Sequence, residues 1–138
     1  MSEAEKVETA ERRRCQRFVA RRRGEYCFFA VIDGQRLPLV DLSLDGFAIP
    51  ASSPPSSDRS FEFVLQRTDV PDEISGRARV VNYLSSADGG QAGCLFDALD
   101  GDGRSRLEDW LTAHVLANAS VPISEKDAAR IVSGPSLV

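Results

Sequence analysis

Two short stretches, RRRCQR at residues 12–17 and DLSLDG at residues 41–46, decide how this chain is interpreted. The first opens a run of seven arginines between positions 12 and 23 that contains no acidic residue. Arginine presents a planar fork of donors that binds phosphate oxygens in pairs and stacks on flat bases, so this run predicts a phosphate or nucleotide ligand. The second stretch supplies a carboxylate, a hydroxyl and a glycine. These groups suit contacts with base edges or backbone amides and a close approach of the backbone to a ligand.

The two stretches together match a two-part signature, RxxxR followed at a distance by (D/N)xSxxG. Arg13 and Arg17 fit the first part, and Asp41, Ser43 and Gly46 fit the second, with twenty-three residues between Arg17 and Asp41. No signature position is substituted. Over roughly residues 11 to 117 the chain therefore resembles the PilZ domain, the bacterial receptor module for the second messenger cyclic di-GMP.

The resemblance assigns a role to each signature residue. It implies that Arg13 and Arg17 hold phosphates and guanine faces, that Asp41 and Ser43 position a guanine, and that Gly46 permits the local backbone path. In this family an arginine directly before RxxxR accompanies an intercalated pair of ligand molecules, whereas an apolar residue there accompanies a single molecule. The ligand-binding residues expected from the resemblance are Arg12, Arg13, Arg17, Asp41, Ser43 and Gly46.

Composition places the chain among ordinary globular proteins, with 42% hydrophobic and 28% charged residues in 138 positions. The net charge of −4 hides an asymmetry, because residues 1–25 carry a net +3 and the remainder a net −7. The longest apolar run is too short for a membrane span and the acidic N-terminus does not resemble a signal peptide, so we expect a cytoplasmic protein. Three cysteines without CxxC spacing and a single histidine, His114, predict free thiols and no metal site.

The strand pattern predicts a mainly β fold. Six short strands are expected, and the Asp33-Gly34 turn together with the turn at residues 87–90 marks two hairpins. Such a set favours a small antiparallel barrel, here a six-stranded PilZ-like barrel, because closure removes exposed edges. From Arg104 the apolar period becomes helical, with Leu107, Trp110 and Leu111 on one face, which predicts a C-terminal helix capping the barrel. The strands are expected at residues 26–32, 37–40, 46–49, 61–65, 75–84 and 91–96.

These observations divide the chain into a flexible N-terminal segment (residues 1–11), a PilZ-like domain (12–117) and a tail (118–138), where Ser124 and Asp127 favour a short helix. No cluster of residues suits catalysis, so no enzyme activity and no cofactor are expected. The resemblance implies a cyclic di-GMP receptor that signals to a separate effector protein controlling motility, attachment or exopolysaccharide. The main alternative is a protein-interaction adaptor of the same fold with weak or no nucleotide binding, as in type IV pilus assembly. The acidic remainder and the lack of an aromatic stacking row argue against nucleic-acid binding by residues 12–23.

Overall fold

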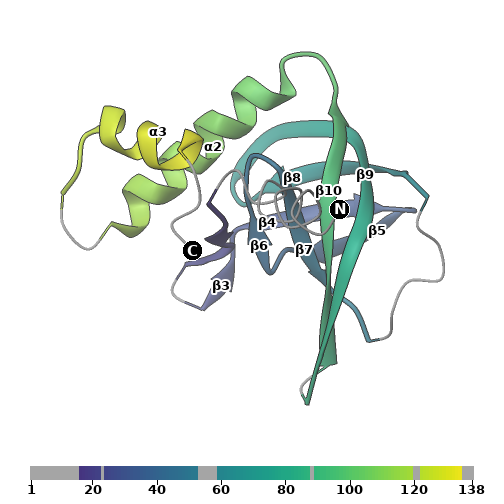
Figure 1. Cartoon of the computed structure of the whole chain (residues 1–138). Coiled ribbons are helices and arrows are strands. Elements are labelled where there is room, and N and C mark those ends of the chain that lie inside the picture. The colour runs from purple at the N-terminus through teal and green to yellow at the C-terminus, as the bar shows by residue number, and fades with distance from the viewer. Residues whose placement is uncertain (1–15, 23, 53–58, 88, 120–121, 135–138) are drawn as a thin grey trace, which may run out of the picture.

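The computed structural model describes residues 16–22, 24–52, 59–87, 89–119 and 122–134. This part of the chain is mainly antiparallel β-sheet followed by two helices (Figure 1). The strands are β1 (Phe18–Val19), β2 (Arg21–Arg22), β3 (Glu25–Tyr26), β4 (Phe28–Ile32), β5 (Gln35–Pro38), β6 (Asp41–Leu42), β7 (Gly46–Pro50), β8 (Phe61–Arg67), β9 (Val70–Ser86) and β10 (Gly89–Leu99). The helices are α2 (Gly103–Asn118) and α3 (Glu125–Ser133). No helix in the described part is long and apolar enough to cross a membrane.

Eight strands form one curled sheet in the order β1-β6-β7-β10-β9-β8-β4-β5, and β2 and β3 form a separate two-stranded pair. The mainly β fold with C-terminal helices is confirmed, but the expected count of six strands is not. The count rises to eight because the sheet also contains β1 at its edge and β6, which lies beyond the strand expected at residues 37–40. Leu39 and Val40 separate β5 from β6. The sheet order has two ends, so the sheet is a curled half-barrel. Leu39 and Val40, between β5 and β6, connect the two ends of the sheet. The Leu39 amide donates to the Phe28 carbonyl of β4, and the Val40 amide donates to the Ala48 carbonyl of β7.

Hairpins make up most of the sheet. The β4–β5 turn has positive φ angles at Asp33 (52°) and Gly34 (78°), which is the backbone of a type I′ turn and confirms the hairpin expected there. The β8–β9 turn was not expected, because it places Asp69 rather than a glycine at positive φ (64°). As a result β9 begins at Val70, five residues earlier than the sequence pattern indicated. The β9 and β10 strands form a long twisted ribbon (Figure 1).

The core lies inside the curl of the sheet and beneath α2. Phe47 and Phe63 are buried in it edge to face at 5.4 Å, and the partly buried Phe96 stacks on Phe63 at 5.4 Å. On the α2 side the Trp110 ring stacks on Phe28 with 6.3 Å between centroids. Leu107, Trp110 and Leu111 of α2 are buried, as the helical spacing predicted. The apolar face of α2 therefore closes one side of the core.

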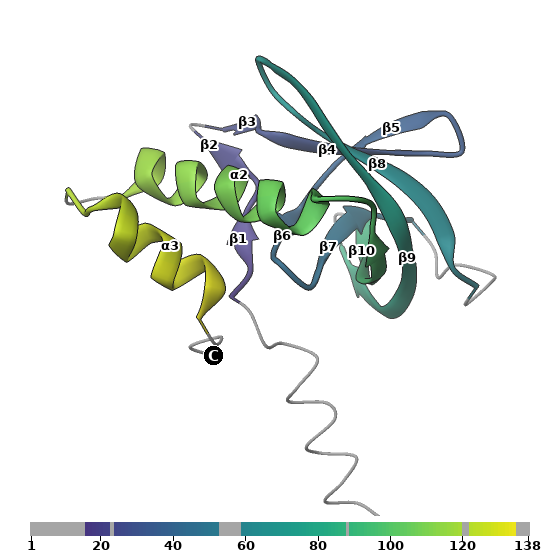
Figure 2. The ribbon, with the colours of Figure 1, turned by 90° about the horizontal axis from the view of Figure 1, so that it is seen from above.

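The second helix packs on the first. Ser124 caps the N-terminus of α3, since its hydroxyl accepts a hydrogen bond from the Asp127 amide at 3.1 Å. Ala128 and Val132 of α3 are fully buried, and Figure 2 shows α3 lying beside α2. α3 occupies the tail segment in which the sequence favours a short helix. The two helices thus form a layer on one side of the sheet.

Candidate functional site

The turn between β6 and β7 carries the second half of the signature, and Ser43 closes it. The Ser43 amide donates to the Gly46 carbonyl at 2.9 Å, and the Ser43 hydroxyl oxygen accepts from the amides of Asp45 (3.1 Å) and Gly46 (3.2 Å). The same hydroxyl lies 3.4 Å from the Gly46 carbonyl, to which it donates. Ser43 is 1% exposed and its donor and acceptor positions are used inside the turn. A direct contact between Ser43 and a guanine stays a prediction.

Gly46 is required by the close approach of two strands. It pairs with Leu95 in the β7–β10 register, and a Cβ atom at this position would lie 1.9 Å from the Cys94 carbonyl oxygen. The carbonyl belongs to the backbone and a Cβ atom is bonded directly to it, so neither group can rotate away. Glycine at position 46 therefore fixes how closely the turn lies against β10.

The first half of the signature meets the second through strand pairing. In the β1–β6 register Phe18 is opposite Leu42 and Val19 is opposite Asp41, which sets Arg17 beside Asp41 at the edge of the sheet. The Arg17 Nη1 atom lies 3.9 Å from the Asp41 Oδ2 atom. The two side chains are 21% and 18% exposed, so each remains accessible from solvent. A cation and an anion from the two ends of the signature thus form one polar patch.

Cys94 lies behind this patch. It is fully buried, and burial raises the pKa of its thiol to about 12, an effect that Arg17 opposes and Asp41 increases. The thiol is therefore neutral at physiological pH and is a poor nucleophile. Cys94 acts as an apolar wall behind the patch.

Two residues of α2 contact the segments that carry the patch, namely the β6–β7 turn and β1, and the sequence analysis included neither among the binding residues. Arg104 Nη1 donates to the Leu44 carbonyl of the β6–β7 turn at 3.2 Å, and His114 Nε2 lies 2.8 Å from the Val19 carbonyl of β1. Sequence separations of 60 and 95 residues explain why no local pattern indicated these contacts.

The structure describes four of the six expected binding residues. Arg17, Asp41, Ser43 and Gly46 lie around one end of β6 as given above, whereas Arg12 and Arg13 fall outside the described residues, as do residues 1–11. Among the described residues, no three His, Cys, Asp or Glu side chains gather in a way that would hold a metal ion.

Comparison with known proteins identifies the family of the chain. The model of the PilZ domain family matches residues 11–113, so the chain belongs to the PilZ domain family. PilZ domains are regulatory receptor or adaptor domains rather than enzymes, and the family is one of cyclic di-GMP receptors.

Among solved structures, the Bacillus subtilis inhibitor of motility (MotI/DgrA) has a similar fold, with a TM-score of 0.61 and 13% sequence identity. The match covers 75% of this chain but 51% of that one, so the chain matches about half the length of that protein. The uncharacterized Legionella protein Lpg0364 matches with a TM-score of 0.47 and 17% identity, over 74% of this chain and 94% of that one. No curated protein matches the sequence.

Proposed function

We propose that this PilZ domain binds cyclic di-GMP at the polar patch formed by Arg17 and Asp41 and transmits binding to a partner protein. The observation that carries the proposal is the β1–β6 register, which joins the two halves of the signature at one accessible place. Arg17 supplies a cation for a phosphate and a flat face for a guanine, and Asp41 supplies an acceptor for a guanine N–H group. Cyclic di-GMP carries a partner for each group, since its phosphodiesters are anions and its guanines have N–H donors.

The arginines that precede β1 complete the proposed site. Arg13 holds phosphate and guanine together with Arg17, and Arg12 accommodates the second molecule of an intercalated pair. Charge-assisted hydrogen bonds of this type are about twice as strong as neutral ones, so they are suited to holding a phosphodiester. The consequence of binding is a change in the surface offered to an effector protein that controls motility, attachment or exopolysaccharide.

The proposal is tested by isothermal titration with cyclic di-GMP, with cyclic di-AMP as the competing ligand. We expect selective binding of cyclic di-GMP, with about two ligands per protein if Arg12 has the proposed role. Arg13→Ala and Arg17→Ala should each weaken affinity more than tenfold, because a hydrogen bond to a charged group contributes about 1.5 to 3 kcal/mol. Asp41→Ala should reduce the discrimination between the two dinucleotides. Arg77→Ala is the matched control, because Arg77 is exposed on β9, two strands away from β7.

Two results would contradict the proposal. Absence of cyclic di-GMP binding by the wild-type protein would favour the protein-interaction adaptor. Wild-type affinity in both Arg13→Ala and Arg17→Ala would place any nucleotide site elsewhere on the molecule.

A further inference from the structure

Helix α2 contacts each half of the binding signature through one side chain. Arg104, in the first turn of the helix, donates to the Leu44 carbonyl inside the β6–β7 turn. His114, ten residues further along, bonds to the Val19 carbonyl, which lies two residues after Arg17. Both partners are backbone carbonyls, so these contacts hold the path of the chain rather than a neighbouring side chain.

The surroundings of His114 define its hydrogen-bonding state. A carbonyl only accepts, so the Nε2 atom must carry the proton that is donated to Val19. The Asn118 Nδ2 atom donates to the His114 carbonyl at 2.7 Å and lies 3.3 Å from the Nδ1 atom of the ring. The ring also packs edge to face against Phe28 at 5.1 Å. His114 is therefore oriented from three sides toward β1.

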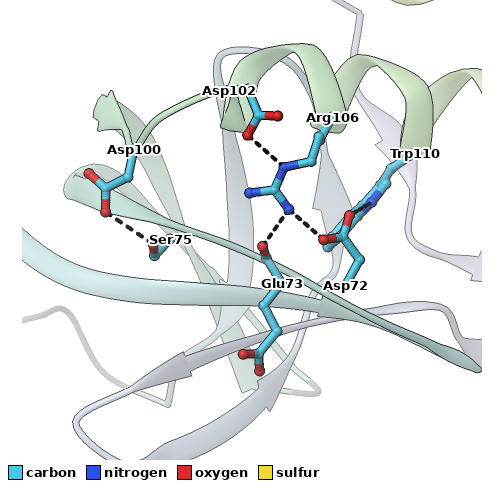
Figure 3. Close-up of polar contacts among 7 residues, drawn as sticks. All are labelled: Asp72, Glu73, Ser75, Asp100, Asp102, Arg106 and Trp110. Atoms are coloured by element: carbon cyan, nitrogen blue, oxygen red, sulfur yellow. Dashed lines mark hydrogen bonds and ion pairs between the residues drawn. The ribbon is translucent and has the colours of Figure 1, made fainter.

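The helix itself is anchored to the opposite part of the sheet. Arg106 bonds to the Asp102 carboxylate through Nε (2.9 Å) and to the Asp72 carboxylate and the Glu73 carbonyl of β9 through Nη1 (Figure 3). The Trp110 Nε1 atom donates to the other Asp72 oxygen at 3.0 Å (Figure 3). With its apolar face buried as well, α2 is a fixed support against which Arg104 and His114 can hold other segments.

We propose that Arg104 and His114 are positioning residues for the nucleotide site, which hold the two halves of the signature at a fixed separation without touching the ligand. This role rests on the proposed function and adds that α2 is the element coupled to ligand binding. Because coupling between two equilibria is reciprocal, a ligand that fixes β1 and the β6–β7 turn also stabilises the contacts of these segments with α2. Ligand binding at the patch therefore changes the stability of the contacts made by α2, and through α2 those of α3, which packs on it.

The sharpest variant is His114→Phe, because it keeps an aromatic ring against Phe28 and removes the donor to Val19. Loss of one hydrogen bond predicts about a three- to tenfold weaker affinity for cyclic di-GMP. A double-mutant cycle with Arg17→Ala separates positioning from general loosening. If His114 acts through β1 on Arg17, then His114→Phe should have little further effect once Arg17 is removed. Fully additive effects would overturn this role for His114.

The second variant is Arg104→Met, which keeps the aliphatic stem and removes the donor to Leu44. We expect a similar loss of affinity that persists in about 0.5 M salt, where the Debye length falls below the 8 Å of physiological salt and long-range charge effects are screened. Arg130→Met, on the exposed surface of α3, removes the same charge as a control. A loss that disappears in high salt, or that Arg130→Met reproduces, would show that Arg104 contributes only its charge.

Amide hydrogen exchange of the unliganded proteins tests the same contacts without nucleotide. His114→Phe should speed exchange at Ala20, whose amide bonds to the Val40 carbonyl, and Arg104→Met should speed exchange at Asp45 and Gly46. Exchange in the β4–β5 hairpin should not change. Wild-type exchange rates at all three amides would overturn the inference even if cyclic di-GMP binds. Absence of binding together with faster exchange would refute the proposed function and leave the support by α2 intact.

Discussion

The two halves of the binding signature differ in how far the fold fixes them. In the β6–β7 turn, Ser43 is 1% exposed with its hydroxyl bonded to two amides, and Gly46 has no room for a side chain. In the arginine half, Arg17 is attached to the sheet through the two-residue strand β1 and makes a 3.9 Å ion pair at an accessible edge. One half is built into the core, and the other lies at its border.

One signature can therefore contain residues required by the fold and residues suited to binding a ligand. The serine and the glycine are explained by turn geometry and strand packing, which apply whether or not a ligand is present. Arg17 and Asp41 form a partly exposed ion pair at the edge of the sheet, and the chemistry of both side chains suits a nucleotide. Substitutions in the turn should therefore change folding, whereas substitutions in the arginine half should change binding.

The largest effect on folding is expected for Gly46→Ala. The added Cβ atom would lie 1.9 Å from the Cys94 carbonyl oxygen, so two paired strands must move apart, and we expect a loss of about 3 kcal/mol or more in the free energy of unfolding. Gly34→Ala is the control, because nothing lies within 4 Å of its added Cβ and only its positive φ of 78° is penalised, at about 1 to 2 kcal/mol. Denaturant unfolding measures both. A smaller loss for Gly46→Ala than for Gly34→Ala would remove the packing argument.

A smaller loss of stability is expected for Ser43→Ala. The substitution leaves the half-buried amide of Asp45 and the buried amide of Gly46 without the hydroxyl acceptor, at a cost of about 1 to 3 kcal/mol. Thr112→Ala is the matched control, since the buried Thr112 hydroxyl donates back to the Glu108 carbonyl of its own helix and its removal leaves no amide without a partner. Urea unfolding of the two variants should separate them. Equal stabilities would mean that the hydroxyl does not hold the turn.

The elements that the sequence predicted are those with a local cause. The Asp33-Gly34 turn combines two residues that tolerate positive φ, and the change to helical spacing after Arg104 marks α2. By contrast, β1 lies in an arginine-rich segment with no alternation, and it is a strand because β6 pairs with it. Asp69 forms a tight turn without a glycine, which hid the start of β9. Tertiary pairing and unusual turn chemistry account for these misses.

The binding site shows the same limit. Resemblance to the two-part PilZ signature indicated Arg12, Arg13, Arg17, Asp41, Ser43 and Gly46, because each half of the signature is a short stretch of sequence. It did not indicate that Ser43 uses its hydroxyl within the turn. Nor did it indicate that α2 supports both stretches, since those contacts depend on how a helix packs on a sheet far along the chain. Spacing and resemblance can predict candidate residues for a site, whereas the contacts that support those residues depend on the fold.

The smallest effect on folding is expected for Arg17→Ala, and it is the most direct test of the comparison. The Arg17–Asp41 pair is 3.9 Å apart and partly exposed, and ion pairs of this kind contribute about 0 to 1 kcal/mol because solvent screens them. We therefore expect the free energy of unfolding to fall by less than about 1 kcal/mol, while affinity for cyclic di-GMP falls more than tenfold. Thermal unfolding and titration on the same preparation compare the two quantities. A loss of stability as large as that of Gly46→Ala would contradict this expectation. It would show that Arg17 stabilises the pairing of β1 with β6, so that the arginine half would also be required by the fold.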